Sequence, residues 1–335
     1  GGLMPVDGKF RMTCNAINIG ALREPTPDIK VTCDLSAQSR KSTTIPASAL
    51  VPEFRMEAGT MTSETDSYTQ KRIFLYSPKG GASAPKDVHP DGNLAEPVRN
   101  DNNGLERNPR DGLVTLIAII DGEEAFTDTN GNGTYDSGEP FVDSAEPWVD
   151  ADDNDKHDTG EEFVDLNANG IWDPGNGQWD AKTKIMAIYK LLWTGPLHSS
   201  PETSRISAVT TTIFDSGQAE IKAYALDANM NPVAAFQENS DYLEWTLGSS
   251  GDASSNDSTT PPMSNAYGLS FDKAANSERK RWKILPQSFT PKPYAFTVED
   301  GYPKDTDPAT NFKLSVKVFV TPGQSCGDYY LAQLT

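Results

Sequence analysis

Apolar residues fall in short runs along this chain, separated by Gly, Pro, Asn and Asp. No long stretch repeats them at the 3.6-residue period of a helix, so the pattern predicts an all-β protein. The predicted strands cover residues 9–17, 28–35, 51–56, 72–76, 112–120, 183–194, 205–214, 217–226, 241–247, 280–285, 294–298, 313–320 and 329–334. A short helix over 183–194 stays open as an alternative, and residues 77–111 and 249–265 are predicted loops.

The chain has 335 residues, enough for two or three domains. Its longest apolar run, around residues 116–120, is far shorter than the roughly 20 residues that a membrane helix needs. We expect strands 112–120 and 183–194 to be sheet neighbours, with residues 121–180 inserted at their hairpin end. The chain opens at Gly1-Gly2 and shows no signal peptide, so we expect a processed or excised part of a longer protein.

The inserted segment carries nearly all of the net charge. Residues 121–180 contain 12 Asp and 6 Glu against one Lys, which gives −17 of the −19 for the whole chain. Because the protein is acidic and has no basic cluster, it is not expected to bind nucleic acid.

The spacing of these acids predicts calcium loops. Residues 128–139 match the pattern D-x-[DN]-x-[DN]-G-x5-E at every defined position. Ca²⁺ takes six to eight oxygens at roughly 2.3–2.6 Å, and short side chains at positions 1, 3 and 5 converge on it where Gly133 permits a tight turn. The expected ligands are Asp128, Asn130, Asn132, the Thr134 carbonyl, Asp136 directly or through water, and Glu139 as a bidentate carboxylate.

Two partial matches follow. The second loop has Asp155 at position 6, where a side chain strains the backbone, and offers Asp150, Asp152, Asn154, the Lys156 carbonyl, Asp158 and Glu161. The third offers Asp165, Asn167, Asn169, the Ile171 carbonyl and Asp173. Its position 12 is Asn176, so a bidentate ligand comes from elsewhere, for example Asp180, or is absent. We expect two to three or more Ca²⁺ ions per chain. The alternative is a solvated acidic loop without ions, in which one complete match and two partial matches to the calcium pattern would have arisen by chance.

Aromatic residues alternate with the acids and are expected to form a small apolar core of Phe126, Tyr135, Phe141, Trp148, Phe163, Trp172 and Trp179. His157, at position 8 of the second loop, is expected to pack rather than to catalyse. Only 10 residues separate the first loop from the second and 3 separate the second from the third, too few for the helices of an EF-hand. The string resembles the calcium loops of thrombospondin type 3 and dockerin-like repeats, which implies a structural role.

The three cysteines contain no C-x-x-C pair, so a zinc cluster is not expected. Cys14 and Cys33 lie on predicted neighbouring strands and are able to pair, which would leave Cys326 single. Disulfides persist in oxidising compartments, and weak calcium modules are loaded outside the cytosol. Both indications favour an extracellular or cell-surface location.

Residues 217–233, GQAEIKAYALDANMNPV, resemble the run G-x-A-x-I-x-A-x-x-x-D-x-x-G-N-P-V of invasin/intimin-type bacterial Ig-like domains (group 1), with Met230 where Gly is frequent. Residues 112–141 resemble Ig-like domains of secreted bacterial surface proteins that carry acidic Asn-Gly insertions. The resemblance implies tandem Ig-like β-sandwiches, which we place at residues 1–197 and 198–335. It implies an adhesin, fibre or appendage without identifying a receptor. Asp227 is expected to stabilise a tight turn rather than to bind an ion.

We predict a non-enzymatic extracellular structural protein, made of calcium-stabilised modules of a bacterial surface filament, stalk or adhesin. Expected partners are further copies of the chain, through edge strands, or other surface proteins; a glycan stays open. The sequence has no G-x-S-x-G, no H-E-x-x-H and no Gly-rich phosphate loop before a helix. The alternative is a carbohydrate-binding module of a secreted enzyme, with Trp148, Trp172 and Trp179 against sugar; a hydrolase with an unrecognised carboxylate pair is third.

Overall fold

The computed structural model describes residues 3–22, 26, 28–81, 85, 99–100, 106–107, 112–195, 206–208, 218–227, 229, 231–234, 242–249, 269–271, 279–283, 287–289, 292–300, 312–319 and 329–334. The chain divides into two compact units, which we describe separately. Unit 1 comprises Gly1–Ile17, Thr26–Asp87 and Leu113–Leu192, and unit 2 comprises Asn18–Pro25, Val88–Gly112 and Trp193–Thr335. The domain boundary at 197/198 stays a prediction, because residues 196–205 lie outside the described part.

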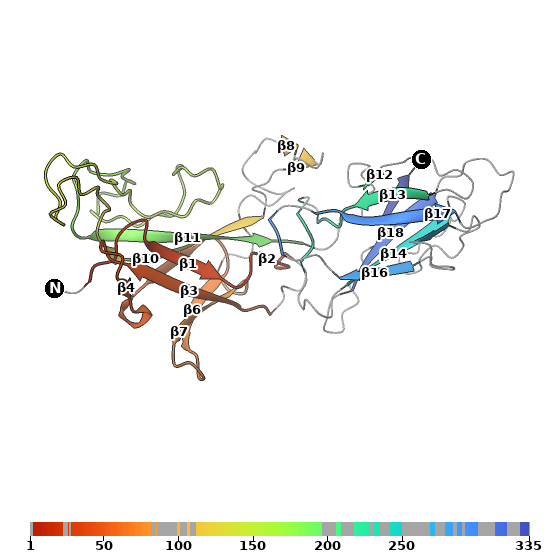
Figure 1. The fold of residues 1–335 in the computed structure, drawn as a ribbon, viewed down its shortest axis with the longest axis horizontal. Helices are drawn as coiled ribbons and strands as arrows, with labels where there is room; N and C mark the ends of the chain where they lie inside the picture. The colour runs from red at the N-terminus through yellow and green to blue at the C-terminus, as the bar shows by residue number, and fades with distance from the viewer. Residues whose placement is uncertain are drawn as a thin grey trace. The chain divides into compact units, whose positions relative to one another are not determined.

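The first unit is built from two antiparallel sheets (Figure 1). One has the order β1 (Phe10–Cys14), β3 (Val31–Gln38), β7 (Arg72–Ser77) and β6 (Thr60–Thr65), with β4 (Thr44–Ile45) beside β3. The other contains β11 (Thr183–Trp193), β10 (Leu113–Gly122) and β5 (Glu53–Met56) in this order, and β2 (Asn18–Ile19) lies in a segment assigned to unit 2. A single 3₁₀ turn, η1 (Ala47–Ala49), follows β4.

Side-chain contacts join the two sheets into a sandwich. Phe54 of β5 and Phe74 of β7 have ring centroids 4.9 Å apart, and the Tyr189 hydroxyl of β11 donates to the Ala16 carbonyl at 2.8 Å. Burial alternates along β1 and β3 because successive residues of a strand point to opposite faces. The predicted all-β class is therefore confirmed for the described residues, and the alternative of a helix over 183–194 is wrong.

β10 is buried on both faces over most of its length, unlike β11 and β5. Ile117 and Ile119 pack against Val149, which belongs to the inserted segment, so the insertion covers the face that a two-layer sandwich would leave open. This explains the run of apolar residues in β10, since a strand covered on both sides has no polar face.

The predicted neighbourhood of the strands on either side of the insertion is confirmed. β10 and β11 pair antiparallel in an unbroken register from Leu113↔Leu192 to Gly122↔Thr183. Residues 123–182 thus leave and return at one hairpin end (Figure 1).

Several strands were not expected from the pattern, among them β2, β4 and β6. β6 is an edge strand whose residues are exposed or half-buried, so it shows no apolar alternation. β8 (Arg99–Asn100) and β9 (Glu106–Arg107) form a short pair inside the stretch predicted as a loop.

Cys14 and Cys33, whose pairing the sequence left open, form a disulfide. These residues are direct partners in the register of β1 and β3. Cys326 lies outside the described residues.

The second unit also contains two four-stranded antiparallel sheets. The first has the order β12 (Ile206–Ala208), β13 (Gln218–Ala223), β17 (Tyr294–Asp300) and β15 (Leu269–Phe271). The second has the order β16 (Arg279–Lys283), β14 (Tyr242–Ser249), β18 (Phe312–Phe319) and β19 (Tyr329–Leu334). Over the described residues, the structure has no helix with the length and apolarity needed to cross a membrane.

The predicted turn at Asp227 is confirmed. Asp227 Oδ1 accepts the N–H groups of Asn229 and Asn231, both at 2.9 Å, and Oδ2 accepts the Gly195 N–H at 2.8 Å. The carboxylate therefore closes the turn with its own backbone neighbours, as a side-chain-stabilised turn requires.

Candidate metal centre

The inserted segment contains the three predicted loops in series. We call residues 128–139 loop 1, residues 150–161 loop 2 and residues 165–173 loop 3, and we number their positions from the first Asp. Each loop consists of turns and bends without regular strands. Isolated bridges between Phe126 and Phe141 and between Trp148 and Phe163 bring together the chain before and after loops 1 and 2.

Loop 1 is folded around its own polar side chains. Asp128, at position 1, accepts the N–H groups of positions 4 and 6, both at 2.7 Å. The amides of Asn130 and Asn132 converge on Asp136 Oδ2 at 2.7 and 2.6 Å. Glu139, at position 12, accepts the N–H of position 2 at 2.7 Å and that of position 9 at 3.0 Å. Asn130, Asn132 and Asp136 are therefore tied directly to one another. Asp128 and Glu139 instead hold the backbone of the loop.

Loop 2 repeats this arrangement. Asp150 accepts the N–H groups of positions 5 and 6, both at 3.1 Å, and the Asn154 amide donates to Asp152 and Asp158 at 2.7 and 2.6 Å. Glu161 accepts the N–H groups of positions 2 and 9 at 2.6 and 2.9 Å. Oxygens of Asp150, Asp152 and Glu161 lie within 4.8 Å of one another. Ligands at 2.3–2.6 Å from one ion are at most about 5 Å apart, so the spacing fits calcium.

Loop 3 has the same first half. Asp165 accepts the N–H groups of positions 5 and 6 at 3.1 and 2.7 Å. The amides of Asn167 and Asn169 converge on Asp173 Oδ2 at 2.6 and 2.8 Å. In all three loops the Asn amides present Nδ2 to a carboxylate, so binding a cation through these side chains would require them to present Oδ1 instead.

The acid that closes loop 3 comes from another part of the chain. Glu146 accepts the N–H of position 2 at 2.7 Å and that of position 9 at 3.2 Å, the two bonds that position 12 accepts in loops 1 and 2. The suggestion that Asp180 supplies this ligand is wrong, because Asp180 bonds to Asn176 and Glu124. Loop 3 therefore has a full set of acids.

A fourth arrangement of the same kind is assembled from three segments, and we call it the composite loop. Asp143 accepts the N–H groups of Asn176 and Gly177 at 3.0 and 2.8 Å. The Asn176 amide donates to Asp180 at 2.9 Å. Glu124 accepts the N–H after Asp143 at 2.7 Å and that of Asp180 at 2.8 Å. Asp143 thus corresponds to position 1, residues 176–180 to positions 5–9 and Glu124 to position 12.

The residues whose carbonyls are predicted ligands share one further bond. At position 7 of each loop, and at the equivalent place in the composite loop, the N–H donates to the Asn side chain two residues earlier at 2.7–2.8 Å, in Thr134, Lys156, Ile171 and Gln178. This bond fixes the direction of the backbone at the position that follows the tight turn.

The expected aromatic core is confirmed and consists of two clusters. Tyr135 stacks on Trp179 with centroids 4.8 Å apart, beside Phe126 and Phe141. His157 stacks on Trp172 at 4.6 Å, so it packs as predicted. Phe163 and Trp148 complete this second cluster.

The indoles also hold the closing acids in place. Trp172 Nε1 donates to the Glu146 carbonyl at 2.8 Å, and Trp179 Nε1 donates to the Glu124 carbonyl at 2.9 Å. Since these rings contact other rings and the backbone of the lobe, the geometry favours packing over sugar binding.

Three of the four closing acids are buried without a basic partner. Glu124, Glu139 and Glu146 are 1%, 6% and 5% exposed, and within the described residues no lysine or arginine pairs with them. Burial raises the pKa of Glu124, against the two N–H groups that it accepts, and burial also raises the pKa of Asp152. A buried carboxylate is costly unless a counter-charge accompanies it, which a cation would supply.

Five site residues escaped the sequence analysis: Glu124, Asp143, Glu146, Asn176 and Gly177. A repeat was available as a signal. Residues 132–136 (NGTYD), 169–173 (NGIWD) and 176–180 (NGQWD) share the pattern N-G-x-aromatic-D. The first two copies have an Asp four residues before their Asn, and the third copy does not. Asp143, from an earlier part of the chain, makes the corresponding hydrogen bonds there.

Comparison with known proteins gives distant matches. No family model matches the sequence, and no curated protein matches it. Among solved structures, the adhesin InvE of Yersinia pseudotuberculosis is 9% identical at a TM-score of 0.25, over all of this chain and 61% of that one. The Escherichia coli adhesin FdeC is 12% identical at a TM-score of 0.23, over 99% and 98% of the two chains. The chain thus spans less than two thirds of InvE.

Proposed function

We propose that this chain is a non-enzymatic, adhesin-like structural protein of a bacterial surface, in which calcium makes the inserted lobe rigid. The β-sandwich unit supports a scaffold role, as does the resemblance of residues 217–233 to invasin/intimin-type domains. The acids fall at calcium-ligand spacing, which accounts for them without a substrate. Self-association or docking to another surface protein would use regions outside this lobe.

The repeated pattern of hydrogen bonds carries the proposal. In loops 1, 2 and 3 and in the composite loop, one Asp accepts two backbone N–H groups of the tight turn, and one Glu accepts two further N–H groups. In loop 2, oxygens of Asp150, Asp152 and Glu161 also lie within 4.8 Å of one another. Calcium bound there would supply positive charge and bridge oxygens that otherwise repel one another.

Thermal unfolding with and without calcium tests the proposal. A cation that binds the folded state alone adds RT ln(1 + [L]/Kd) of stability, about 2.7 kcal/mol for each site at a hundred times its Kd. We expect the melting temperature of the lobe to rise in millimolar calcium and to fall in chelator, and native mass spectrometry to detect up to four ions.

Magnesium is the matched control, because it prefers six ligands at shorter distances and keeps its water. Equal melting in calcium, magnesium and chelator would exclude a calcium-dependent lobe. Binding of monomeric protein to a glycan array would instead support the carbohydrate-binding alternative.

A further inference from the structure

Loop 2 differs from its neighbours in how deeply it is buried. Asp150, Ala151 and Asp153 are 3%, 4% and 7% exposed. The equivalent residues of loop 1 are all exposed, and those of loop 3 are exposed or half-buried. The middle loop is therefore the part of the string that lies against the sandwich.

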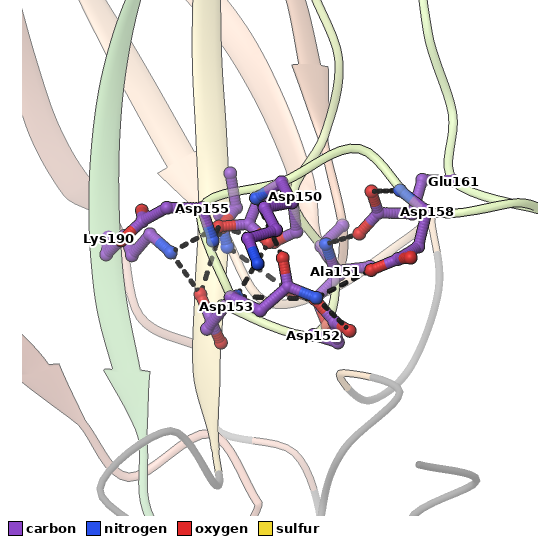
Figure 2. A network of polar contacts seen from close by, with 12 residues as sticks. Asp150, Ala151, Asp152, Asp153, Asp155, Asp158, Glu161 and Lys190 are labelled. Atoms are coloured by element: carbon purple, nitrogen blue, oxygen red, sulfur yellow. Dashed lines mark hydrogen bonds and ion pairs between the residues drawn. The ribbon is translucent and has the colours of Figure 1, made fainter.

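Two residues of the sandwich bond directly to Asp150, the first predicted ligand of this loop, and Figure 2 shows one of them, Lys190, beside Asp150 and Asp153. Thr115 of β10 donates its hydroxyl to the Asp150 carbonyl at 2.8 Å. Lys190 of β11 donates to Asp150 Oδ2 at 2.9 Å and to Asp153 Oδ1 at 2.5 Å. Thr115 and Lys190 are direct partners in the register of β10 and β11, so a single cross-strand pair makes these hydrogen bonds to loop 2.

Apolar packing supports the same contact. Val149, the residue before Asp150, is 2% exposed and packs on Ile117 and Ile119 of β10. Val164 and Met186 extend this cluster. Loop 2 is therefore docked by burial as well as by hydrogen bonds.

The flanking loops lack such a counter-charge. Within the described residues, no ammonium or guanidinium pairs with the ligand acids of loops 1 and 3. Arg40 reaches loop 1, but it bonds to the Gly133 carbonyl and to Glu123. Without a cation, like charges repel in loops 1 and 3, whereas Lys190 offsets part of the charge in loop 2.

We propose that loop 2 remains docked on β10 and β11 without calcium, and that Thr115 and Lys190 are the positioning residues that hold its first ligand there. The flanking loops order only when the cation binds, and they do so against this fixed middle loop. The inference rests on the proposed calcium-binding function for what happens in loops 1 and 3.

Amide hydrogen exchange of the whole chain in chelator tests the inference. The amides to follow are those bonded to the acids at positions 1 and 12: Ala151 and Asp155 in loop 2, Thr129 and Gly133 in loop 1, and Leu166 and Gly170 in loop 3. We expect the loop 2 amides to exchange at least about tenfold more slowly than the others, since Asp155 keeps its hydrogen bond to Asp150, which Lys190 pairs, and Ala151 stays buried.

Variants separate docking from general stability. T115V removes the hydroxyl at nearly constant volume, T115S keeps it, and K190M/D153N removes both charges of the buried pair. We expect T115V and K190M/D153N to lose the slow exchange of loop 2 in chelator, and T115S and K190R to keep it. K184M is the matched control, because Lys184 lies on the same strand but pairs with the exposed Asp121 at 2.8 Å.

Two results would overturn the inference: equal exchange of all three loops in wild-type protein with chelator, or slow loop 2 exchange in T115V and K190M/D153N. Protection of the β10 and β11 amides reports in the same experiment whether a variant is folded. Failure of the proposed function looks different, since exchange in loops 1 and 3 would then be the same with calcium as with chelator.

Discussion

At the scale of single residues, the backbone of the loops is the most constrained feature. Positions 4 and 6 take left-handed dihedral angles in all three loops and at the equivalent places of the composite loop, in Gly131, Gly133, Asp153, Asp155, Ala168, Gly170, Gly175 and Gly177. Glycine adopts this region freely, whereas a Cβ there is strained. Loop 2 has Asp at both positions, so it bears more strain than its neighbours.

The backbone strain at Asp155 can be tested by replacing this residue with glycine. Asp155 has φ 62° and is the position-6 residue that is Gly in the other loops. We expect D155G to raise the free energy of unfolding by about 1 kcal/mol in chelator, measured by urea denaturation. D155N keeps the Cβ and removes the charge, so a gain that is equally large in D155N would assign the effect to charge repulsion and not to the backbone.

At the scale of secondary-structure elements, the sandwich is tied together near its first strands. Cys14 and Cys33 join β1 to β3, and Cys33 is fully buried. The bridge closes a loop with a sequence separation of 19, which restricts the unfolded chain.

Breaking this bridge gives a prediction for the sandwich that is independent of calcium. We expect C14S/C33S to lose about 3 kcal/mol of unfolding free energy, as the chain-entropy estimate gives for a loop of similar size. Reductant should lower the stability of the wild-type protein by a similar amount and leave the variant unchanged. A wild-type protein with the same denaturation midpoint in reductant would contradict this expectation.

At the scale of the whole molecule, the inserted lobe is held together by acids that accept hydrogen bonds from residues far away in the chain. Glu146 closes loop 3 across 27 residues, and Glu124 reaches Asp180 across 56 residues. Each bound ion would therefore fasten one part of the insertion to another and limit the freedom of the whole segment.

Removing Glu146 tests whether a distant acid completes loop 3. We expect E146Q to bind one ion fewer than the wild-type protein in native mass spectrometry, or to bind that ion at least about tenfold more weakly, because it loses a bidentate carboxylate. Glu162 is exposed and pairs with Arg55, so E162Q serves as the matched control. An unchanged ion count and affinity in E146Q would show that loop 3 does not use this acid.

Features that depend on residues close together in the chain could be predicted from the sequence. The all-β class followed from the period of the apolar residues, and the register between β10 and β11 agrees with the two predicted strands around the insertion. The ligand positions of loops 1 and 2 were readable because all of their acids lie within twelve residues. Cys14 and Cys33 were identifiable because they lie on adjacent strands.

Contacts between groups far apart in the chain could not be predicted, because they depend on the folded arrangement. Three such contacts depend on how the insertion folds back over β10. They are the hydrogen bonds of Glu146 to loop 3, those of Asp143 to residues 176–180, and those of Thr115 and Lys190 to loop 2. No local spacing specifies such contacts, since they arise from the packing of Val149 and the aromatic clusters. The edge strand β6 escaped prediction for a related reason, because a polar edge leaves no apolar period in the sequence.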